Sequence, residues 1–533
     1  MRKLFFLFLA LICVAKTGRA ATTYYVDYTN GSDTYDGTEK THTTGVTGPW
    51  QHAPGMAGCS NNCAAYTSTG GNSWILKGCV TWPAVTLPWV PVYSAQTSTE
   101  NAGGLDRTWW DTTVIGCSSA WNRPIINAGG VVAGSNNTVV DFHNFAFGLQ
   151  YVEFKGGFFS ASTPQLTYLL TAQNQSLAVS YDHLYFHGVT WTGVIDSCWL
   201  VGGDSHNPNL SPNASFHDNV LDLTDSLVGG YTACYALYGG PPIIYNNVVK
   251  NTSNGFVVNG SSSVHDNLIT NVGPSLQYGP GGSGSYHGNG FEDNSTEGLN
   301  LYNNVIAHLA SGVLGIWIGL VQGHTFTGWN NLLYDTQPNN VIDIANALPP
   351  SNGCGAGGQG AQYCNNSGTF NWYNNTVECG PDSAPTADCA APNTSATAIL
   401  FTNNHFVTTQ SGGSTCIGTA NCTGTTNLTQ SKATASGQGY TSSETYAFSP
   451  VSGAGSTVAA GTNVPSVTSA TTYACTEVSS PYVTVSCPAL VAKARPATPD
   501  IGAYQFTTAP SSQPGNPASF VLLPPANLIA KAQ

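Results

Sequence analysis

The chain repeats one short pattern seven times, in which an apolar strand-like segment ends at an Asn-Asn or Asp-Asn pair and a second apolar segment follows. The second Asn residues of these pairs are Asn219, Asn247, Asn267, Asn304, Asn331, Asn375 and Asn404. The successive steps between them are 28, 20, 37, 27, 44 and 29 residues. Periods of this size are typical of solenoids, in which each repeat forms one coil and packs only on its neighbours.

The Asn pair suits a sharp corner between two strands. Asn tolerates the left-handed backbone conformation that a tight corner needs, and stacked Asn side chains can hydrogen-bond along the solenoid axis. The Leu and Trp-Asp periodicities that mark leucine-rich repeats and propellers are absent from the sequence. The repeat therefore predicts an all-β solenoid, a parallel β-helix running from about Tyr24 to Phe506, with the seven Asn residues stacked at one corner.

The charge of the chain limits its partners. Only 8% of the residues are charged, and 14 Lys and Arg face 27 Asp and Glu, for a net charge of −13. Between Arg123 and Lys432 the only basic side chains apart from His are Lys155 and Lys250. A nucleic acid would be repelled, whereas a neutral glycan, or an acidic glycan bridged by a cation, would not. We therefore expect an extracellular polysaccharide as partner and a monomeric protein.

The N-terminus has the features of a signal peptide. Arg2 and Lys3 precede an apolar stretch that ends near Ala15, and Gly18-Arg19-Ala20 supplies a small-residue cleavage site. No apolar run is long enough to insert in a membrane. The sequence thus predicts a signal peptide over 1–20, a β-helix with its caps over 21–506, and a Pro/Ser-rich tail over 507–533. Export to the medium or the cell surface follows from this division.

An exported chain with an even number of cysteines favours disulfides. Of the 15 cysteines, Cys13 lies in the expected signal peptide, which leaves fourteen. A zinc site is the alternative, but the sequence has neither two CxxC pairs nor a CxxC motif near an HxxxH motif. The pairs close in sequence, which we expect to be bonded, are Cys59/Cys63, Cys354/Cys364, Cys379/Cys389, Cys416/Cys422 and Cys475/Cys487. The partners of Cys79, Cys117, Cys198 and Cys234 stay open.

Motifs at both ends resemble those of secreted proteins in the pectate-lyase-like superfamily of right-handed parallel β-helices. They are Tyr24–Asp27, Gly31–Asp33, Asp36–Thr38 and Pro49-Trp50 at the start, and Ser449-Pro450, Arg495-Pro496 and Pro499–Tyr504 at the end. The resemblance implies that the Asn corner lies between the second and third strands of each coil. It implies no single activity, because the superfamily contains lyases, hydrolases, epimerases and non-enzymatic surface proteins.

This position of the Asn corner predicts which segments form the first strand of each coil and where the loops beside it lie. The first-strand candidates are Val194–Trp199, Cys234–Tyr238, Gly255–Asn259, Gly290–Asn294, Val313–Leu320 and Val341–Ala345. Three coils carry extra residues, at 201–213, 273–289 and 346–369, and all three inserts fall at corners flanking the first strands. Loops on both sides of one sheet make a groove, and in the resembled superfamily polysaccharide binds in that groove.

Alternation within three successive first strands selects three outward side chains. If Phe291, the isoleucines of Val313–Leu320 and those of Val341–Ala345 point inward, then Glu292, Trp317 and Asp343 point outward. We expect these three side chains to line up along the groove.

Two carboxylates on either side of an exposed Trp suit a glycoside hydrolase. Glu292 and Asp343, two coils apart, would be separated by about 9–10 Å at the backbone, near the upper end of the range for inverting enzymes. His287 could assist proton transfer, and Trp317, Trp199 and Tyr286 are the candidates for sugar binding. Such a hydrolase requires no cofactor.

Two other functions stay open. A polyuronate lyase needs a base to take the α-proton, for which His287 or a Tyr is available, and Ca²⁺ could bind Asp196, Asp204 or Asp293. The motifs of the polygalacturonase relatives are not intact here, so their residue roles are not carried over. A non-catalytic glycan-binding or adhesin protein needs only the fold, the aromatic groove and the tail. The sequence alone therefore leaves undecided whether the protein is an enzyme.

Overall fold

The structure is a computed structural model that describes residues 21–506 with gaps. The gaps are 92–98, 118–121, 129–137, 143–146, 156–157, 160–167, 173–176, 188–189, 192–196, 202–212, 223–234, 240–242, 251, 253, 259–262, 273–288, 294–297, 310–313, 321–322, 337–340, 345–366, 380–388, 392–395, 409–419, 441–447, 451, 471–475, 479–483 and 487–492. The expected signal peptide and the Pro/Ser-rich tail lie outside the described residues.

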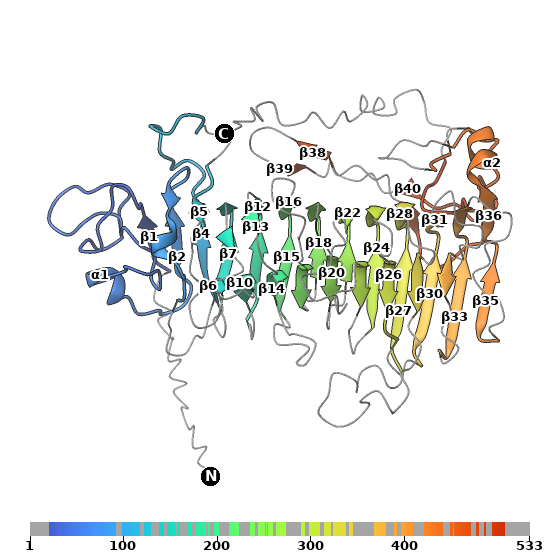
Figure 1. Cartoon of the computed structure of the whole chain (residues 1–533), viewed down its shortest axis with the longest axis horizontal. Helices are drawn as coiled ribbons and strands as arrows, with labels where there is room; N and C mark the ends of the chain where they lie inside the picture. Colours follow the sequence, from blue (N-terminus) through green and yellow to red (C-terminus); the bar gives the residue numbers. More distant parts are fainter. Residues whose placement is uncertain are drawn as a thin grey trace, which may run out of the picture.

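The chain forms a right-handed parallel β-helix, as the repeat predicts (Figure 1). Three long sheets of parallel strands run along one axis, and each full coil contributes one strand to each sheet. We call them the first, second and third sheets, in the order in which a coil visits them. In the described part of the chain they hold 9, 13 and 12 strands.

The first sheet consists of β6 (Thr138–Asp141), β10 (Tyr168–Ala172), β14 (Ser197–Val201), β17 (Tyr235–Gly239), β20 (Asn254–Val258), β23 (Asn289–Asp293), β26 (Leu314–Ile318), β29 (Ile342–Ile344) and β32 (Ala390–Ala391). The second sheet consists of β1 (Thr23–Val26), β2 (Ser73–Leu76), β4 (Glu100–Gly103), β7 (Phe147–Gln150), β11 (Val179–Asp182), β15 (Ala214–His217), β18 (Ile243–Tyr245), β21 (Ser263–His265), β24 (Leu299–Tyr302), β27 (Thr325–Trp329), β30 (Thr369–Tyr373), β33 (Ala398–Thr402) and β35 (Cys422–Thr425).

The third sheet consists of β3 (Thr81–Trp82), β5 (Ile125–Asn127), β8 (Glu153–Lys155), β12 (Tyr185–His187), β16 (Val220–Asp222), β19 (Val248–Lys250), β22 (Leu268–Val272), β25 (Val305–Leu309), β28 (Leu332–Thr336), β31 (Thr376–Cys379), β34 (His405–Thr408) and β36 (Leu428–Ser431). Outside these sheets lie the helices α1 (Asn61–Ala64) and α2 (Lys432–Gly437), a 3₁₀ turn (Ala84–Thr86), and the paired strands β9 (Phe158–Phe159) with β13 (Thr190–Trp191), β37 (Ser469–Ala470) with β40 (Lys493–Ala494), and β38 (Thr476–Val478) with β39 (Thr484–Ser486). None of the helices in the described ranges has the length and apolar character needed to cross a membrane.

The Asn pairs form the corner between the second and third sheets, and the two residues of each pair have different tasks. The first residue adopts the left-handed conformation, with φ of 58° at Asn303 and 55° at Asp218 and Asn330. The second residue stacks: Asn304 Oδ1 accepts from Asn267 Nδ2 at 2.9 Å, and Asn304 Nδ2 donates to Asn331 Oδ1 at 3.0 Å. The seven expected Asn residues therefore lie at one corner, and an eighth, Asn427, extends the ladder beyond Asn404.

Inward side chains of successive coils stack to form the core. In the first sheet, Phe256, Phe291, Ile316 and Ile342 are register partners, and each is fully buried. Parallel strands about 4.8 Å apart allow such apolar columns to pack continuously along the axis. The residue that follows each of these four in its own strand therefore points away from the core.

The C-terminal motif residues fasten the last described segment onto the Asn corner. Arg495 donates to Asn330 Oδ1 at 2.8 Å, and Asn374 Nδ2 donates to the carbonyl of Asp500 at 3.0 Å. Asn403 Nδ2 donates to the carbonyl of Thr462 at 2.6 Å. The first residues of three Asn pairs thus hold a segment distant in sequence. This segment lies at the C-terminal end of the β-helix, where α2 also packs (Figure 1).

Disulfides close some of the expected loops. Cys59–Cys63 and Cys379–Cys389 are bonded as predicted, and Cys79 bonds Cys117, a connection that the sequence left open. Cys422 is also disulfide-bonded. The pairs Cys354/Cys364 and Cys475/Cys487, like Cys416 and Cys234, lie outside the described residues, and the side chain of Cys198 is not described.

Candidate functional site

Three side chains predicted to share one line occupy the same register position of the first sheet. Glu292 on β23 pairs with Trp317 on β26, and Trp317 pairs with Asp343 on β29. Trp317 lies between the core residues Ile316 and Ile318, and Asp343 lies between Ile342 and Ile344. Glu292 follows the core residue Phe291. Since successive side chains of a strand alternate, all three belong to the outer face of the sheet. We call them the carboxylate–Trp column.

The Glu292 carboxylate is held in place from its own strand. Asn289 Nδ2 donates to Glu292 Oε2 at 2.7 Å, and the backbone N–H of Asn289 donates to Asn254 Oδ1 at 2.8 Å. Glu292 is 8% exposed, so it is largely shielded although it lies on the outer face. Asn254 and Asn289 were not among the predicted site residues. Their signal is an Asn at the start of two successive first strands, Asn254 on β20 and Asn289 on β23.

Trp317 lies between the two carboxylates and is half-buried. Its six-membered ring lies over Gly319, where an added Cβ would be 3.4 Å from both Cη2 and Cζ3. The indole therefore lies along the sheet beside Gly319. A large aromatic surface in this position is suited to packing against the apolar face of a sugar ring.

Asp343 is half-buried, and burial raises the pKa of its carboxyl above the ordinary value. A carboxylic acid that keeps its proton to a higher pH than usual is better suited to act as a proton donor. One strand separates Asp343 from Glu292, so their backbones are about 9.6 Å apart at the usual strand spacing. The separation of the carboxyl groups themselves depends on both side chains, and room for a water between them is what inversion requires.

Of the other predicted site residues, Asp293 is described and does not belong to this column. Asp293 is in register with the core residues Val258 and Ile318 and is 2% exposed, so it lies on the opposite alternation from Glu292. His287, Tyr286, Asp196 and Asp204 lie outside the described residues. For Trp199 only its place on β14 is described. Within the described ranges, no three His, Cys, Asp or Glu side chains are grouped so that they could hold a metal ion.

Basic side chains are distributed unevenly over the three sheets. The nine described strands of the first sheet contain no Lys, Arg or His. Lys250 lies on the third sheet, where its Nζ is 3.7 Å from Asp222 Oδ2, and Lys155 lies on the same sheet. The first sheet therefore offers carboxylates, but no cationic base, along its strands.

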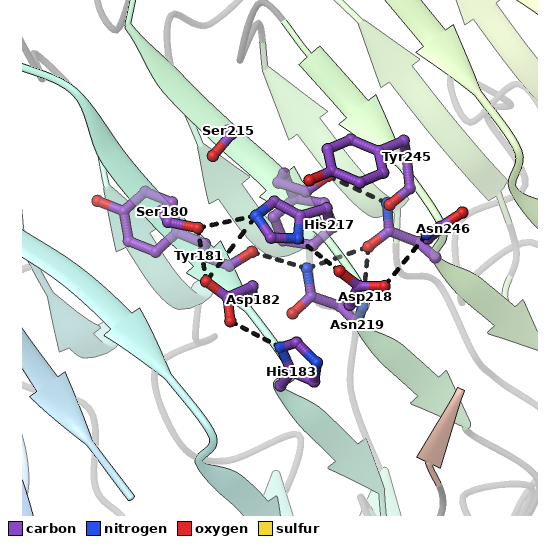
Figure 2. Close-up of polar contacts among 12 residues, drawn as sticks. Ser180, Tyr181, Asp182, His183, Ser215, His217, Asp218, Asn219, Tyr245 and Asn246 are labelled. Carbon is purple, nitrogen blue, oxygen red and sulfur yellow. Dashed lines mark hydrogen bonds and ion pairs between the residues drawn. The ribbon is translucent and has the colours of Figure 1, made fainter. Parts of the chain in front are cut away.

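A second polar group lies on the outer face of the second sheet and was not anticipated. Stacked rings run along this face, His217, Tyr245, His265, Tyr302 and Trp329, with centroids 4.4–5.2 Å apart. Next to the first of these rings, Ser180, Asp182 and Asp218 surround His217 (Figure 2). The sequence signal for this polar group was the His-Asp dipeptide that precedes Asn219.

No protein-family model matches the chain, and no curated protein matches it. Several solved structures are similar to it at low identity. A GH136 lacto-N-biosidase from Eubacterium ramulus is 11% identical, with a TM-score of 0.46, over 77% of this chain and 67% of that one. A rhamnogalacturonan lyase is 14% identical, with a TM-score of 0.39, over 76% and 87% of the two chains. A pectate lyase is 11% identical, with a TM-score of 0.35, over 92% and 98%. At these identities and scores the similarity does not indicate which residues act.

Proposed function

We propose that this protein is an extracellular glycoside hydrolase that cleaves a polysaccharide bound along the first sheet. The observation that carries the proposal is the register of Glu292, Trp317 and Asp343, which puts an aromatic surface between two carboxylates on one face. Four described cysteines at the N-terminal end are paired in disulfides, which fits an oxidising compartment.

The column divides the work of hydrolysis between its two acids. Asp343, whose pKa burial raises, donates a proton to the glycosidic oxygen as the bond from that oxygen to the anomeric carbon breaks. Glu292, oriented by Asn289, takes a proton from the water that attacks the opposite face of the sugar. Trp317 holds the ring between them. Water is the only co-reactant, and the product has the inverted anomeric configuration.

A lyase is the less favoured enzyme. It must remove a proton from carbon beside a uronate carboxylate, and its base and counter-charge are supplied by cations or a bound metal ion. The described strands of the first sheet carry no cationic residue, and Lys250 is paired with Asp222 on another sheet. A carboxylate pair without nearby cations would repel a polyuronate.

A panel of neutral and acidic polysaccharides tests the proposal. We expect new reducing ends without the ultraviolet absorbance of an unsaturated sugar. Absorbance from an unsaturated product would contradict hydrolysis and indicate a lyase. Binding without any product would leave the protein a glycan-binding module, with Trp317 as its contact residue.

Replacing Trp317 with Ala should weaken binding of the glycan about 10- to 100-fold, because burying a large apolar side chain is worth roughly 1.5–3 kcal/mol. Affinity electrophoresis or calorimetry on the glycan identified by the panel would measure the change. Trp329→Ala is the matched control, since Trp329 is half-buried on the second sheet and stacks on Tyr302. Equal losses in the two variants would place the binding face elsewhere.

The rate should fall as pH rises through the raised pKa of Asp343, because hydrolysis needs this carboxyl protonated. An aryl glycoside with a good leaving group needs little protonation, so Asp343→Asn should retain most activity on it while losing activity on the polysaccharide. The pH dependence of kcat measures the first effect, and kcat of Asp343→Asn on the two substrates measures the second. If Asp343→Asn loses activity equally on both substrates, Asp343 is not the proton donor.

A further inference from the structure

A second chemically distinct group lies on the second sheet, away from the carboxylate–Trp column. Ser180 lies on β11, and His217 ends the neighbouring strand β15, followed directly by Asp218 at the Asn corner (Figure 2). Asp182, the register partner of His217, lies on the same outer face as Ser180. All these side chains come from two adjacent coils, so the solenoid holds them at a fixed spacing.

The contacts connect a hydroxyl, an imidazole and a carboxylate in sequence. Ser180 Oγ lies 3.0 Å from His217 Nε2, and His217 Nδ1 lies 2.7 Å from Asp218 Oδ2. With the Nδ1 hydrogen donated to Asp218, Nε2 is free to accept the hydroxyl hydrogen of Ser180. A nucleophile within hydrogen-bond reach of a base that a third group orients is the arrangement used for acyl transfer.

Asp182 competes with His217 for the hydroxyl hydrogen of Ser180 and also supplies a negative charge near the imidazole. Its Oδ2 accepts from Gln150 Nε2 at 2.6 Å and its Oδ1 accepts from His183 Nδ1 at 2.7 Å, so both oxygens have nitrogen donors. Ser180 Oγ donates to Asp182 Oδ2 at 2.5 Å, so the hydroxyl hydrogen must turn from Asp182 to His217 Nε2 before Ser180 can act as a nucleophile. Burial raises the pKa of Asp182, but these hydrogen bonds outweigh it, and the net pKa is lowered. The resulting carboxylate, 3.9 Å from His217 Nε2, would stabilise an imidazolium.

The repeat provides an internal comparison. His265 is paired with Asp266 at 2.7 Å in the same way as His217 with Asp218, two coils further along. The residue that corresponds to Ser180 in the coil before His265 is Ile243, which has no hydroxyl. Among the described coils, a Ser–His contact accompanies the His–Asp pair only at His217. The stacked rings alone do not require that serine.

The position beside Ser180 on β7 is a glycine covered by an amide side chain. Gly148 is its neighbour on β7 and carries no side chain, and Asn101 Oδ1 on β4 lies over it, 2.5 Å from where a Cβ would be. Ser180 and His217 are both half-buried, with the His217 side chain 17% exposed. The hydroxyl is therefore within reach of solvent, and an acyl group would approach Ser180 from the solvent side, because Asn101 Oδ1 fills the space over Gly148.

We propose that Ser180, His217 and Asp218 form a second active centre, which hydrolyses short acyl esters such as those on acylated glycans. Ser180 Oγ bonds to the acyl carbon while its proton passes to His217 Nε2, and the ester C–O bond breaks as that proton passes to the leaving alcohol. Water then attacks the acyl-serine, His217 takes its proton and returns one to Ser180 Oγ, and a carboxylic acid leaves. The centre acts independently of Glu292 and Asp343.

A fluorophosphonate probe followed by peptide mass spectrometry tests the nucleophile on the unaltered full-length protein. We expect label on Ser180, and none on Ser215, its half-buried register partner on β15. Label on other residues only, or no label, overturns the proposal.

Hydrolysis of p-nitrophenyl acetate tests the base. Ser180→Ala and His217→Ala should each lower the rate roughly 100-fold or more, the size of a general-base contribution. Ser215→Ala and His265→Ala are matched controls that should leave it unchanged. If His217→Ala and His265→Ala behave alike, or if only Asp182→Asn removes the activity, the proposed centre is wrong. Circular dichroism melting of each variant separates unfolding from loss of the nucleophile.

Discussion

Glu292→Gln is expected to lower kcat on the cleaved polysaccharide by about 100- to 10,000-fold, the range that general acid–base catalysis contributes. The glutamine has the same shape, and its amide oxygen can still accept from Asn289 Nδ2, so the local packing of β23 is retained. What is lost is the ability to take a proton from water. Binding should change little, because Trp317 is unaltered, so the loss appears in kcat rather than in KM.

Two further variants test whether the loss of kcat is specific to Glu292. Asn289→Ala removes the donor that orients Glu292, and we expect a smaller loss of kcat, of about 10-fold, from misplacement of the base. Asp222→Asn on the third sheet removes an outward carboxylate that faces Lys250, and kcat should not change. An unchanged kcat in Glu292→Gln, measured by release of reducing ends, would exclude Glu292 as the base.

The fold could be predicted from the sequence because its strongest constraint is local and repeated. Each Asn pair places a left-handed residue and a stacking residue at consecutive positions, and this geometry is the same in each coil from Asn219 to Asn404. Once the corner was placed, counting strands assigned β20, β23, β26 and β29 to one sheet. Asn427 was missed because Thr426, instead of Asn or Asp, takes the left-handed position before it.

The candidate site was less predictable, because alternation gives the direction of a side chain but not its surroundings. It placed Glu292, Trp317 and Asp343 in one column, yet it gave no warning that Glu292 would be only 8% exposed. Asp293, a candidate Ca²⁺ ligand, follows Glu292 in sequence and is 2% exposed, because adjacent residues of a strand face opposite sides. The contact of Ser180 with His217 joins residues 37 positions apart, and only the register of β11 with β15 reveals it.

The Asn corner gives the largest stability effect that we expect. Replacing Asn304 with Ala removes an oxygen that accepts from the backbone N–H of Asn267 at 3.1 Å and from its Nδ2 at 2.9 Å. It also removes the donor to Val264 O and to Asn331 Oδ1, both at 3.0 Å. Asn304 is 1% exposed, so water cannot readily replace these bonds. Each buried polar group left without a partner costs about 1–3 kcal/mol, and we expect a total loss of about 3–6 kcal/mol in the free energy of unfolding.

Asn300→Ala is the matched control, because Asn300 lies on β24 of the same coil but is exposed on the outer face. A surface substitution of this kind should change the free energy of unfolding by no more than about 0.5 kcal/mol. Coils of a solenoid contact mainly their neighbours, so the loss at Asn304 should also appear as faster amide exchange in β22, β25 and β28 than in β2 or β4. Denaturant unfolding and hydrogen exchange of the two variants measure both effects. Equal stability of Asn304→Ala and Asn300→Ala would mean that the backbone, and not the ladder of side chains, holds the corner.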